Sequence, residues 1–300
     1  MIPEPFEYHQ PKTLAEAARL VAQWGGDGKI LAGGHSLIPL MRLRLAAPKH
    51  LIDIGRLAEL KYLRADNGKL QLGALTTHYQ IESSELLKQK CPLLPETAAE
   101  IGDVQVRNKG TIGGSLAHSD PAADWPAAIL ALGAELQAVS VRGERWIPAK
   151  EFFVDLLTTA LKPDEILTAI RVPSLPVSAK TPEAPRAGDA YLKVPQPASG
   201  FAIVGVAARV VLDEEKKTIE DVGIGITGVG PKGYRADAVE AALRGKSPSA
   251  KRLAEAARHA AEGVDANSDL YASAEYRAHL AGVYTRRALE KALERAGGKS

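Results

Sequence analysis

The chain has 300 residues, of which 38 are basic and 36 acidic, so its formal charge is only +2. A chain of this length exceeds one small hydrophobic core and predicts two or three domains. The near balance of charges provides no strong field of one sign, which argues against nucleic acid or an anionic membrane as the partner. A small or neutral partner is favoured.

Cys91 is the only cysteine. The chain alone can therefore form no intramolecular disulfide, no iron–sulfur cluster and no thiolate zinc site. The N-terminus carries acids and prolines where a secretory signal has a basic patch, and no window approaches the roughly 20 apolar residues of a membrane span. These features predict a cytoplasmic protein without a membrane span.

The first hundred residues predict alternating helices and strands. Thr13 can cap a helix over residues 14–24, with Glu16 as its capping-box partner and two glycines as the stop. Short apolar or alternating runs predict strands, and "ADNG" between two of them is a turn signal. The predicted strands cover residues 29–33, 50–55 and 69–75, and a second helix covers 93–101.

The middle of the chain predicts another helix and two strands. Asp120 is a natural N-cap, Pro121 suits the first helical position, and Gly133 suits the end of the helix. Strands are predicted over 134–140 and 165–173, and the proline-rich stretch 174–188 predicts a domain boundary. Beyond it, strands over 191–194, 200–213 and 218–229 are followed by helices over 235–245, 249–263 and 273–296. The whole pattern predicts an α+β protein.

Two glycine-rich segments stand out, "LAGGHSLIPLMRLR" at 31–44 and "TIGGS" at 111–115. Adjacent glycines let the backbone adopt positive φ and bring successive N–H groups close to a ligand, which suits phosphate oxygens. Hydroxyl groups beside both segments add neutral donors. One such segment is most often a simple turn, but two of them predict a pyrophosphate site.

Gly223, Gly225 and Gly228 also match the dinucleotide fingerprint G-x-G-x-x-G. That fingerprint requires a helix to start inside the motif. Here the intervening isoleucines continue a strand pattern, and Gly230-Pro231 blocks a helix. We therefore expect these glycines to permit close packing against a neighbouring element or to mark a strand irregularity.

The segments 32–44 and 107–134, about eighty residues apart, resemble the two FAD-binding segments of the medium subunit of molybdenum hydroxylases. This family includes the flavoprotein subunit of bacterial carbon monoxide dehydrogenases and is similar to the FAD-binding subunit of xanthine dehydrogenases. The likeness extends over nearly the whole chain. It implies an α+β fold with a two-lobed, vanillyl-alcohol oxidase/PCMH-like FAD-binding domain and a smaller C-terminal α/β domain that contains an antiparallel sheet and helices. The expected domains are residues 1–57, 58–176 and 177–300.

The resemblance also implies roles for individual residues. Residues 32–38 would direct backbone amides at the pyrophosphate, residues 111–115 would form the second wall, Asp124 would contact the ribose side, and Lys193 would approach the isoalloxazine ring. The implied cofactor-binding set is Ala32, Gly33, Gly34, His35, Ser36, Leu37, Ile38, Ile101, Gly110, Thr111, Ile112, Gly113, Gly114, Ser115, Ala117, Asp124, Ile166, Leu167 and Lys193.

The function implied by the resemblance is that of an electron-transfer subunit, with FAD as its cofactor and no catalytic or metal-binding residue of its own. Its partners would be a small [2Fe-2S] subunit and a large molybdopterin subunit, in a dimer of heterotrimers, with an external electron acceptor. Two alternatives stay open: a self-contained FAD oxidoreductase of the vanillyl-alcohol oxidase type, and a nucleotide-binding module without turnover.

Several polar residues have a second interpretation. Asp120, Asp124 and His118 could form a metal site or an acid/base pair, but the set lacks a complete ligand complement and helix capping is favoured. His35 could be an acid or base, although hydrogen bonding is favoured in a glycine-rich segment. Lys193 could equally be a surface lysine. Structural or surface roles are predicted for His9, His50, His78, His259 and His279.

Overall fold

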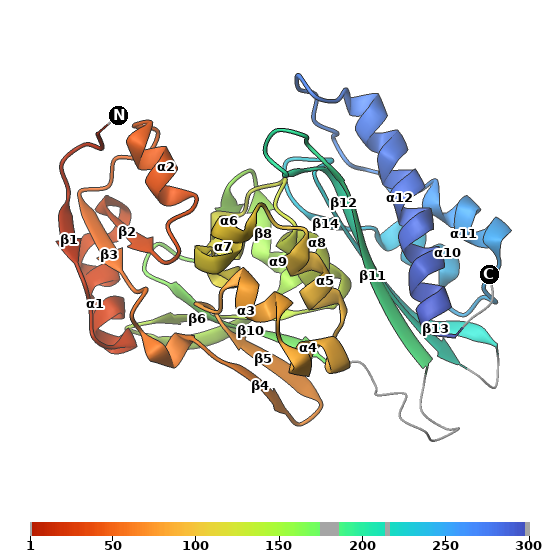
Figure 1. Ribbon diagram of the computed structural model, residues 1–300, viewed down its shortest axis with the longest axis horizontal. Helices are drawn as coiled ribbons and strands as arrows, with labels where there is room; N and C mark the ends of the chain where they lie inside the picture. Colours follow the sequence, from red (N-terminus) through yellow and green to blue (C-terminus); the bar gives the residue numbers. More distant parts are fainter. Residues whose placement is uncertain (1, 175–185, 214–216, 298–300) are drawn as a thin grey trace.

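The computed structural model describes residues 2–174, 186–213 and 217–297. Three sheets of three, five and four strands follow one another along the chain and lie side by side (Figure 1). The α+β prediction is therefore confirmed. Most of the proline-rich stretch in which we predicted a domain boundary lies outside the described residues.

The N-terminal sheet is parallel, with strand order β1-β3-β2. Helix α1 connects β1 to β2, and the buried alanines and Val21 of this helix pack with Ile52 of the sheet. The Thr13 hydroxyl accepts the N–H of Glu16 as predicted, but the Glu16 carboxylate accepts the N–H of Lys12 instead of closing the capping box. The elements are β1 (Glu7–His9), α1 (Leu14–Trp24), η1 (Gly25–Asp27), β2 (Gly28–Leu31), α2 (Leu37–Arg42) and β3 (His50–Asp53).

The central sheet is antiparallel, with strand order β4-β5-β10-β6-β7. The predicted turn between its first two strands is present, with Asn67 and Gly68 at positive φ. Its strands are β4 (Leu63–Asp66), β5 (Lys69–Gly73), β6 (Glu135–Ser140), β7 (Gly143–Pro148) and β10 (Ile166–Pro173). A β8–β9 hairpin and eight helical segments complete this part: η2 (Ala58–Leu60), α3 (His78–Glu82), α4 (Glu85–Lys90), α5 (Leu93–Ala99), α6 (Val104–Lys109), α7 (Ile112–His118), α8 (Trp125–Ala131), α9 (Ala149–Phe152), β8 (Phe153–Asp155) and β9 (Thr158–Thr159).

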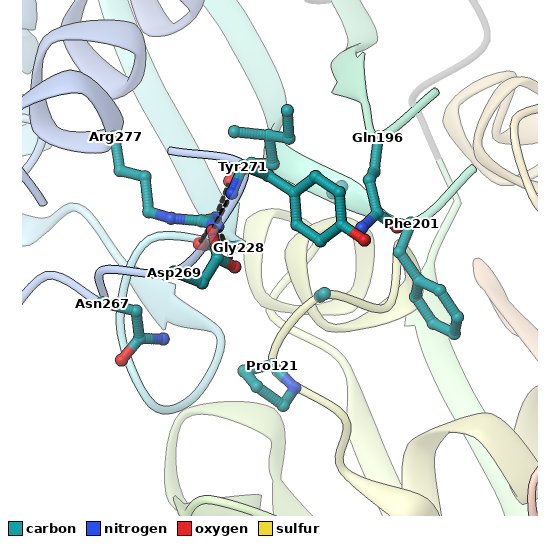
Figure 2. Close-up of a pocket in the computed structure, with 11 residues that line it drawn as sticks. Pro121, Gln196, Phe201, Gly228, Asn267, Asp269, Tyr271 and Arg277 are labelled. Carbon is teal, nitrogen blue, oxygen red and sulfur yellow. Dashed lines mark hydrogen bonds and ion pairs between the residues drawn. The ribbon is translucent and has the colours of Figure 1, made fainter. Parts of the chain in front are cut away.

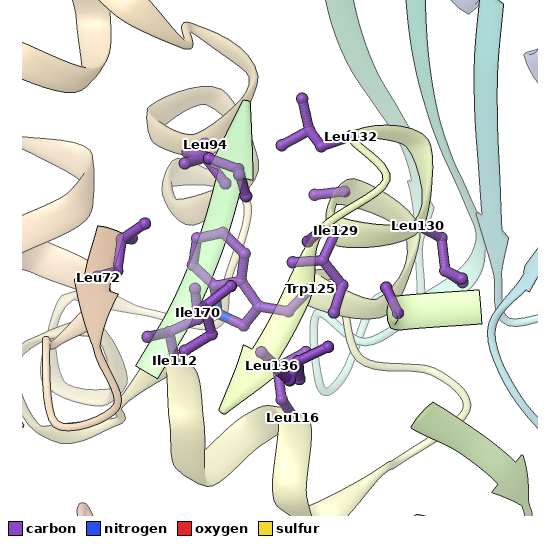
Figure 3. Close-up of a cluster of buried hydrophobic side chains, with 14 of the residues drawn as sticks. Leu72, Leu94, Ile112, Leu116, Trp125, Ile129, Leu130, Leu132, Leu136 and Ile170 are labelled. Atoms are coloured by element: carbon purple, nitrogen blue, oxygen red, sulfur yellow. The ribbon is translucent and has the colours of Figure 1, made fainter. Parts of the chain in front are cut away.

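The largest hydrophobic core lies between this sheet and its helices. Trp125 at the start of α8 is fully buried there and is surrounded by side chains from α5, α7 and strand β10 (Figure 3). Burial of large apolar side chains provides the main favourable free energy of folding. The core therefore fixes α7 and α8 relative to the sheet, and both helices border the site described below.

Helix α8 starts later than the sequence predicted. It begins at Trp125, while the Asp120 carboxylate accepts the N–H of Ala122 at 2.8 Å and so caps a turn that precedes the helix. Asp124 occupies the N-cap position without a capping bond because its carboxylate accepts a hydrogen bond from the Tyr191 hydroxyl on β11 (Arg186–Pro195). The predicted end is confirmed, since Gly133 follows the helix at φ +59°.

The C-terminal sheet is antiparallel, with strand order β11-β12-β13-β14. Helix α12 packs on β11 and β12, whereas α8 packs on β13 from the side of the central sheet (Figure 1). The elements are β11 (Arg186–Pro195), β12 (Ala202–Asp213), β13 (Thr218–Thr227), β14 (Tyr234–Arg235), α10 (Asp237–Leu243), α11 (Ala250–Ala257) and α12 (Ala274–Arg295).

The G-x-G-x-x-G sequence lies on β13 and its end, as its strand pattern predicted. A Cβ atom on Gly223 would overlap the carbonyl oxygen of Ala131, and one on Gly225 would overlap that of Ala127, both on α8. These glycines therefore allow the α8 backbone to lie directly against the sheet, which confirms the packing interpretation.

Across the described residues, every helix is too short or too polar to span a bilayer.

Candidate functional site

A cavity of about 740 Å³ lies where the three parts of the chain meet. Its walls come from β2, the starts of β10, α2 and α7, and the segments 157–163 and 199–201. This volume is within the range of small-molecule and cofactor sites.

The first glycine-rich segment leaves β2 and enters α2. Gly34 has φ +79°, and a Cβ atom there would lie 2.7 Å from the Cδ1 atom of Ile38, so the position requires glycine. Among the described residues, the backbone N–H groups of residues 34–37 donate to no protein acceptor. The segment lines the cavity and offers it a row of N–H donors, an arrangement that suits phosphate oxygens.

The second glycine-rich segment is helical. We expected its adjacent glycines to present free N–H groups to a ligand, but Gly113 and Gly114 lie in the first turn of α7, with Thr111 as the N-cap. Their N–H groups are already bonded: that of Gly113 donates to Ala74 O at 2.9 Å, and that of Gly114 donates to Thr111 Oγ1 at 3.1 Å. This segment therefore shapes the cavity by its lack of side chains, and the Ser115 hydroxyl is its available polar group.

The two segments face each other directly. A Cβ atom on Gly33 would overlap the carbonyl oxygen of Lys109, so the backbones touch at this point. Farther along, a Cβ atom on Gly114 would lie 2.8 Å from Thr111 Oγ1 and 3.7 Å from the Cβ atom of Ala32. A narrow slot without bulky side chains results, bordered by the N–H row on one side.

Asp124 and Lys193 form a buried ion pair beside the cavity. The Lys193 ammonium lies 2.9 Å from Asp124 Oδ1 and also donates to the carbonyl oxygens of Glu100 and Gly200. Only 1% of the lysine side chain is exposed, which excludes a surface lysine. The Tyr191 hydroxyl donates to the same carboxylate oxygen at 2.5 Å.

This network joins four elements: the end of α5, the start of α8, strand β11 and the turn that contains Gly200. Burial raises the pKa of Asp124 to about 6, and the Lys193 ammonium and Tyr191 hydroxyl oppose that rise. Asp124 lines the cavity, whereas Lys193 does not. Lys193 thus positions the cavity wall.

His78 also borders the cavity, although we assigned it a structural or surface role. Its Nδ1 accepts the indole N–H of Trp125 at 3.1 Å, and burial lowers its pKa to about 4. The ring is therefore neutral at pH 7 and carries its proton on Nε2, next to Gly110. No local sequence signal distinguished His78, because its partner is 47 residues away.

All but three of the predicted cofactor-binding residues line this cavity. Ile38 is 43% exposed on α2, Ile112 is fully buried in the core because helical periodicity turns it away from the slot, and Lys193 lies behind the wall. The residues that line the cavity are Ala32, Gly33, Gly34, His35, Ser36, Leu37, Ile101, Gly110, Thr111, Gly113, Gly114, Ser115, Ala117, Asp124, Ile166 and Leu167. The sequence did not reveal the lining segments 157–163 and 199–201, which have no distinctive motif.

The alternative of a metal or acid/base site at Asp120 and Asp124 finds no support. Asp120 caps a turn and Asp124 is paired with Lys193. Within the described residues, neither belongs to a group of three potential metal ligands.

A second cavity of about 170 Å³ adjoins the first, and both are bordered by Phe201. Figure 2 shows Arg277 on one side of it, with Tyr271, Gln196 and Phe201 along another. The Arg277 guanidinium donates to Ile203 O and Gly228 O, each at 2.7 Å, and pairs with Asp269. Arg277 thereby attaches α12 to the strand ends beside the large cavity.

Two family models together match almost the whole chain. The FAD binding domain in molybdopterin dehydrogenase matches residues 4–175, and the CO dehydrogenase flavoprotein C-terminal domain matches residues 189–292. The chain belongs to this flavoprotein family. The recognition made from the two glycine-rich segments is confirmed, as is FAD as the cofactor of the family.

Relatives of this flavoprotein are similar along their full length. The carbon monoxide dehydrogenase medium chain of Hydrogenophaga pseudoflava is 38% identical over 295 residues, which cover 98% of this chain and 99% of the relative. The 6-hydroxypseudooxynicotine dehydrogenase complex subunit alpha of Paenarthrobacter nicotinovorans is 38% identical over 296 residues, which cover 99% of this chain and 97% of that subunit. A solved structure of carbon monoxide dehydrogenase from Hydrogenophaga pseudoflava has a TM-score of 0.92 at 40% identity, covering 98% of this chain and 99% of that one.

The two-domain fold expected from the resemblance is confirmed by these matches. Because these relatives are subunits of multi-subunit oxidoreductases, the family also implies partner subunits for this flavoprotein. The cavity fits the family's cofactor, since the N–H row at residues 34–37 and the slot free of side chains meet the needs of a dinucleotide diphosphate.

Proposed function

We propose that this flavoprotein is the FAD-binding electron-transfer subunit of a molybdenum hydroxylase and that the 740 Å³ cavity is its flavin site. The observation that carries the proposal is the row of backbone N–H groups at residues 34–37, which line the cavity together with Gly114 and have no acceptor among the described residues. FAD, when bound, accepts electrons singly or in pairs and releases them to an external acceptor.

The chain's own residues would bind and orient the cofactor. We propose that the N–H groups of residues 34–37 and the hydroxyls of Ser36 and Ser115 hold the diphosphate, and that Ile101, Ile166 and Leu167 provide apolar contacts and exclude water. Asp124 borders the same cavity and would accept a hydrogen bond from the cofactor, while Lys193 and Tyr191 hold its carboxylate in place.

The partners in this proposal are a small subunit with [2Fe-2S] clusters and a large subunit with molybdopterin, assembled as a dimer of heterotrimers. The chain's single cysteine supports this division of labour, because Cys91 is fully buried and burial raises the pKa of its thiol. An iron–sulfur cluster requires several accessible thiolates. A chain with a single cysteine forms no disulfide of its own, and this suits a reducing compartment. We therefore propose a cytoplasmic location.

We further propose that the chain divides at residues 57 and 176. The three-stranded sheet lies within residues 1–57, the five-stranded sheet within 58–176, and the four-stranded sheet with its helices within 177–300.

A self-contained oxidase of the vanillyl-alcohol oxidase type would need a substrate cavity with its own catalytic groups. Turnover of an organic substrate by the isolated chain would favour that alternative.

Replacement of Gly114 tests the site. Gly114→Leu directs a side chain into the slot toward Ala32, so we expect the purified complex to lose most of its bound FAD, measured by flavin absorbance per protein after gel filtration. Gly26→Leu is the matched control, because a Cβ atom at Gly26 meets nothing within 4 Å. Circular dichroism establishes that both variants are folded. Full flavin content in folded Gly114→Leu would contradict the assignment of this cavity.

A further inference from the structure

A cluster of two histidines and one glutamate lies on the N-terminal sheet, outside the lining of both cavities. Glu7 and His9 alternate along β1 and share one face, and the parallel register pairs Glu7 with His50 on β3. Within the described residues, these three are the group whose potential metal-ligand atoms all lie within 4.8 Å of one another.

The ligand atoms converge on one point. His9 Nε2 lies 3.2 Å from His50 Nδ1, and Glu7 Oε2 lies 3.4 Å from His50 Nδ1 and 3.8 Å from His9 Nε2. Zinc bonds to histidine nitrogen and carboxylate oxygen measure about 2.0–2.2 Å, so two ligands at a tetrahedral angle are separated by about 3.3–3.6 Å. The three separations match this spacing within a few tenths of an ångström.

A single hydrogen bond does not account for the arrangement as well. The same nitrogen of His50 faces both the His9 ring and the Glu7 carboxylate, so a proton shared by one pair leaves the third atom without a partner. A divalent cation accepts all three lone pairs together. Two imidazoles and one carboxylate also form a ligand set that first-row transition metals prefer.

Trp24 fixes the orientation of both imidazoles. Its ring is stacked on His50 at 4.2 Å between centroids and 14° between planes, and it lies 4.3 Å from the His9 ring. The two histidine side chains are only 22% and 17% exposed, whereas that of Glu7 is 71% exposed. The imidazoles are thus held in place by packing, and the open side of the cluster faces solvent beside Glu7.

We propose that Glu7, His9 and His50 bind one divalent first-row transition-metal ion of the zinc class, with water at the fourth position. The ion links β1 to β3 and so holds the first strand on the sheet that precedes the flavin cavity. None of the three ligands lines that cavity. The proposed metal ligands therefore lie outside the proposed flavin site.

Cobalt titration of the full-length, untagged protein tests the proposal after dialysis against a chelator. We expect one equivalent of Co²⁺ to produce the intense visible absorption of tetrahedral cobalt and to quench Trp24 fluorescence, and Zn²⁺ to displace it. Glu7→Gln and His9→Gln should each weaken cobalt binding at least about tenfold, the lower end of the losses found when even indirect partners of a metal are removed.

His259→Gln is the matched control, because His259 forms a two-member pair with Glu262 at 2.6 Å. It should bind cobalt as the wild type does. Since the Glu7 side chain is largely exposed, Glu7→Gln should stay folded, and its thermal unfolding without metal should match the wild type. Trp24→Phe should remove the quenching while one equivalent of cobalt still binds.

Three results would overturn the proposal. These are the absence of tetrahedral cobalt absorption in the wild type, equal affinity in folded Glu7→Gln, and equal loss of affinity in His259→Gln. The cluster would then be a set of side-chain hydrogen bonds that link β1 to β3.

Discussion

Replacement of Lys193 by methionine provides a sharp test of the ion pair beside the cavity. Met keeps most of the side-chain volume but removes the ammonium that lies 2.9 Å from Asp124 Oδ1. At pH 8 the variant leaves a buried carboxylate without its countercharge, and removal of one partner from a buried pair costs about 3–5 kcal/mol. We expect the free energy of unfolding to fall by that amount.

The loss should depend on pH in a definite direction. Burial already raises the pKa of Asp124 to about 6, and loss of the ammonium raises that pKa further. At pH 5 the carboxyl group of the variant is protonated, so the cost falls to that of the lost hydrogen bonds, about 1–2 kcal/mol. The destabilisation should therefore grow between pH 5 and pH 8.

Urea unfolding at both pH values, followed by circular dichroism, measures the two free energies. Lys150→Met is the matched control, because its ammonium lies 3.0 Å from Asp237 but both side chains are largely exposed, and such surface pairs contribute about 0–1 kcal/mol. The double variant Lys193→Met/Asp124→Asn should recover part of the loss at pH 8. A pH-independent loss, or one no larger than in Lys150→Met, would refute the explanation.

Three further changes test other contacts. Burial raises the pKa of Asp189 from 3.8 to about 6, so the stability that its protonated form contributes is fully present below pH 3.8 and is lost as the pH rises through 6. In urea unfolding, the stability of Asp189→Asn relative to the wild type should therefore rise by about 3 kcal/mol between pH 3 and pH 7, and no rise would contradict the raised pKa. Gly225→Ala inserts a methyl group against Ala127 and should cost about 1–3 kcal/mol in urea unfolding, whereas a neutral effect would mean that α8 does not contact β13 as described. Arg277→Met removes the donor of Asp269 Oδ2 and of two carbonyl oxygens and should lower the unfolding free energy by about 2–4 kcal/mol. A change within about 0.5 kcal/mol would show that this network contributes little.

The sequence predicted most of the long elements, because their signals are local. Thr13 and Gly25 mark the ends of α1, and the alternation on either side of Gly223 identifies β13. Short elements were missed or misplaced. The second glycine-rich segment forms a helical turn despite the low helix propensity of glycine, because Thr111 caps it and the Gly113 backbone must approach Ala74.

The candidate site was predictable where the residues that form it are consecutive in the sequence, as in residues 32–37. It was not predictable where partners are distant. Strand alternation at Lys193 gave no indication that Glu100, 93 residues away, would provide an acceptor. The proximity of His9 and His50 likewise depends on parallel pairing of strands that lie 41 residues apart.

The direct contact of Gly33 with the carbonyl of Lys109 has a consequence for how the slot can vary. Where two main chains touch, the walls are as close as peptide dimensions allow, and any side chain at position 33 would force them apart. Related sequences that keep glycine here can therefore change at other positions while the width of the slot at this point stays the same.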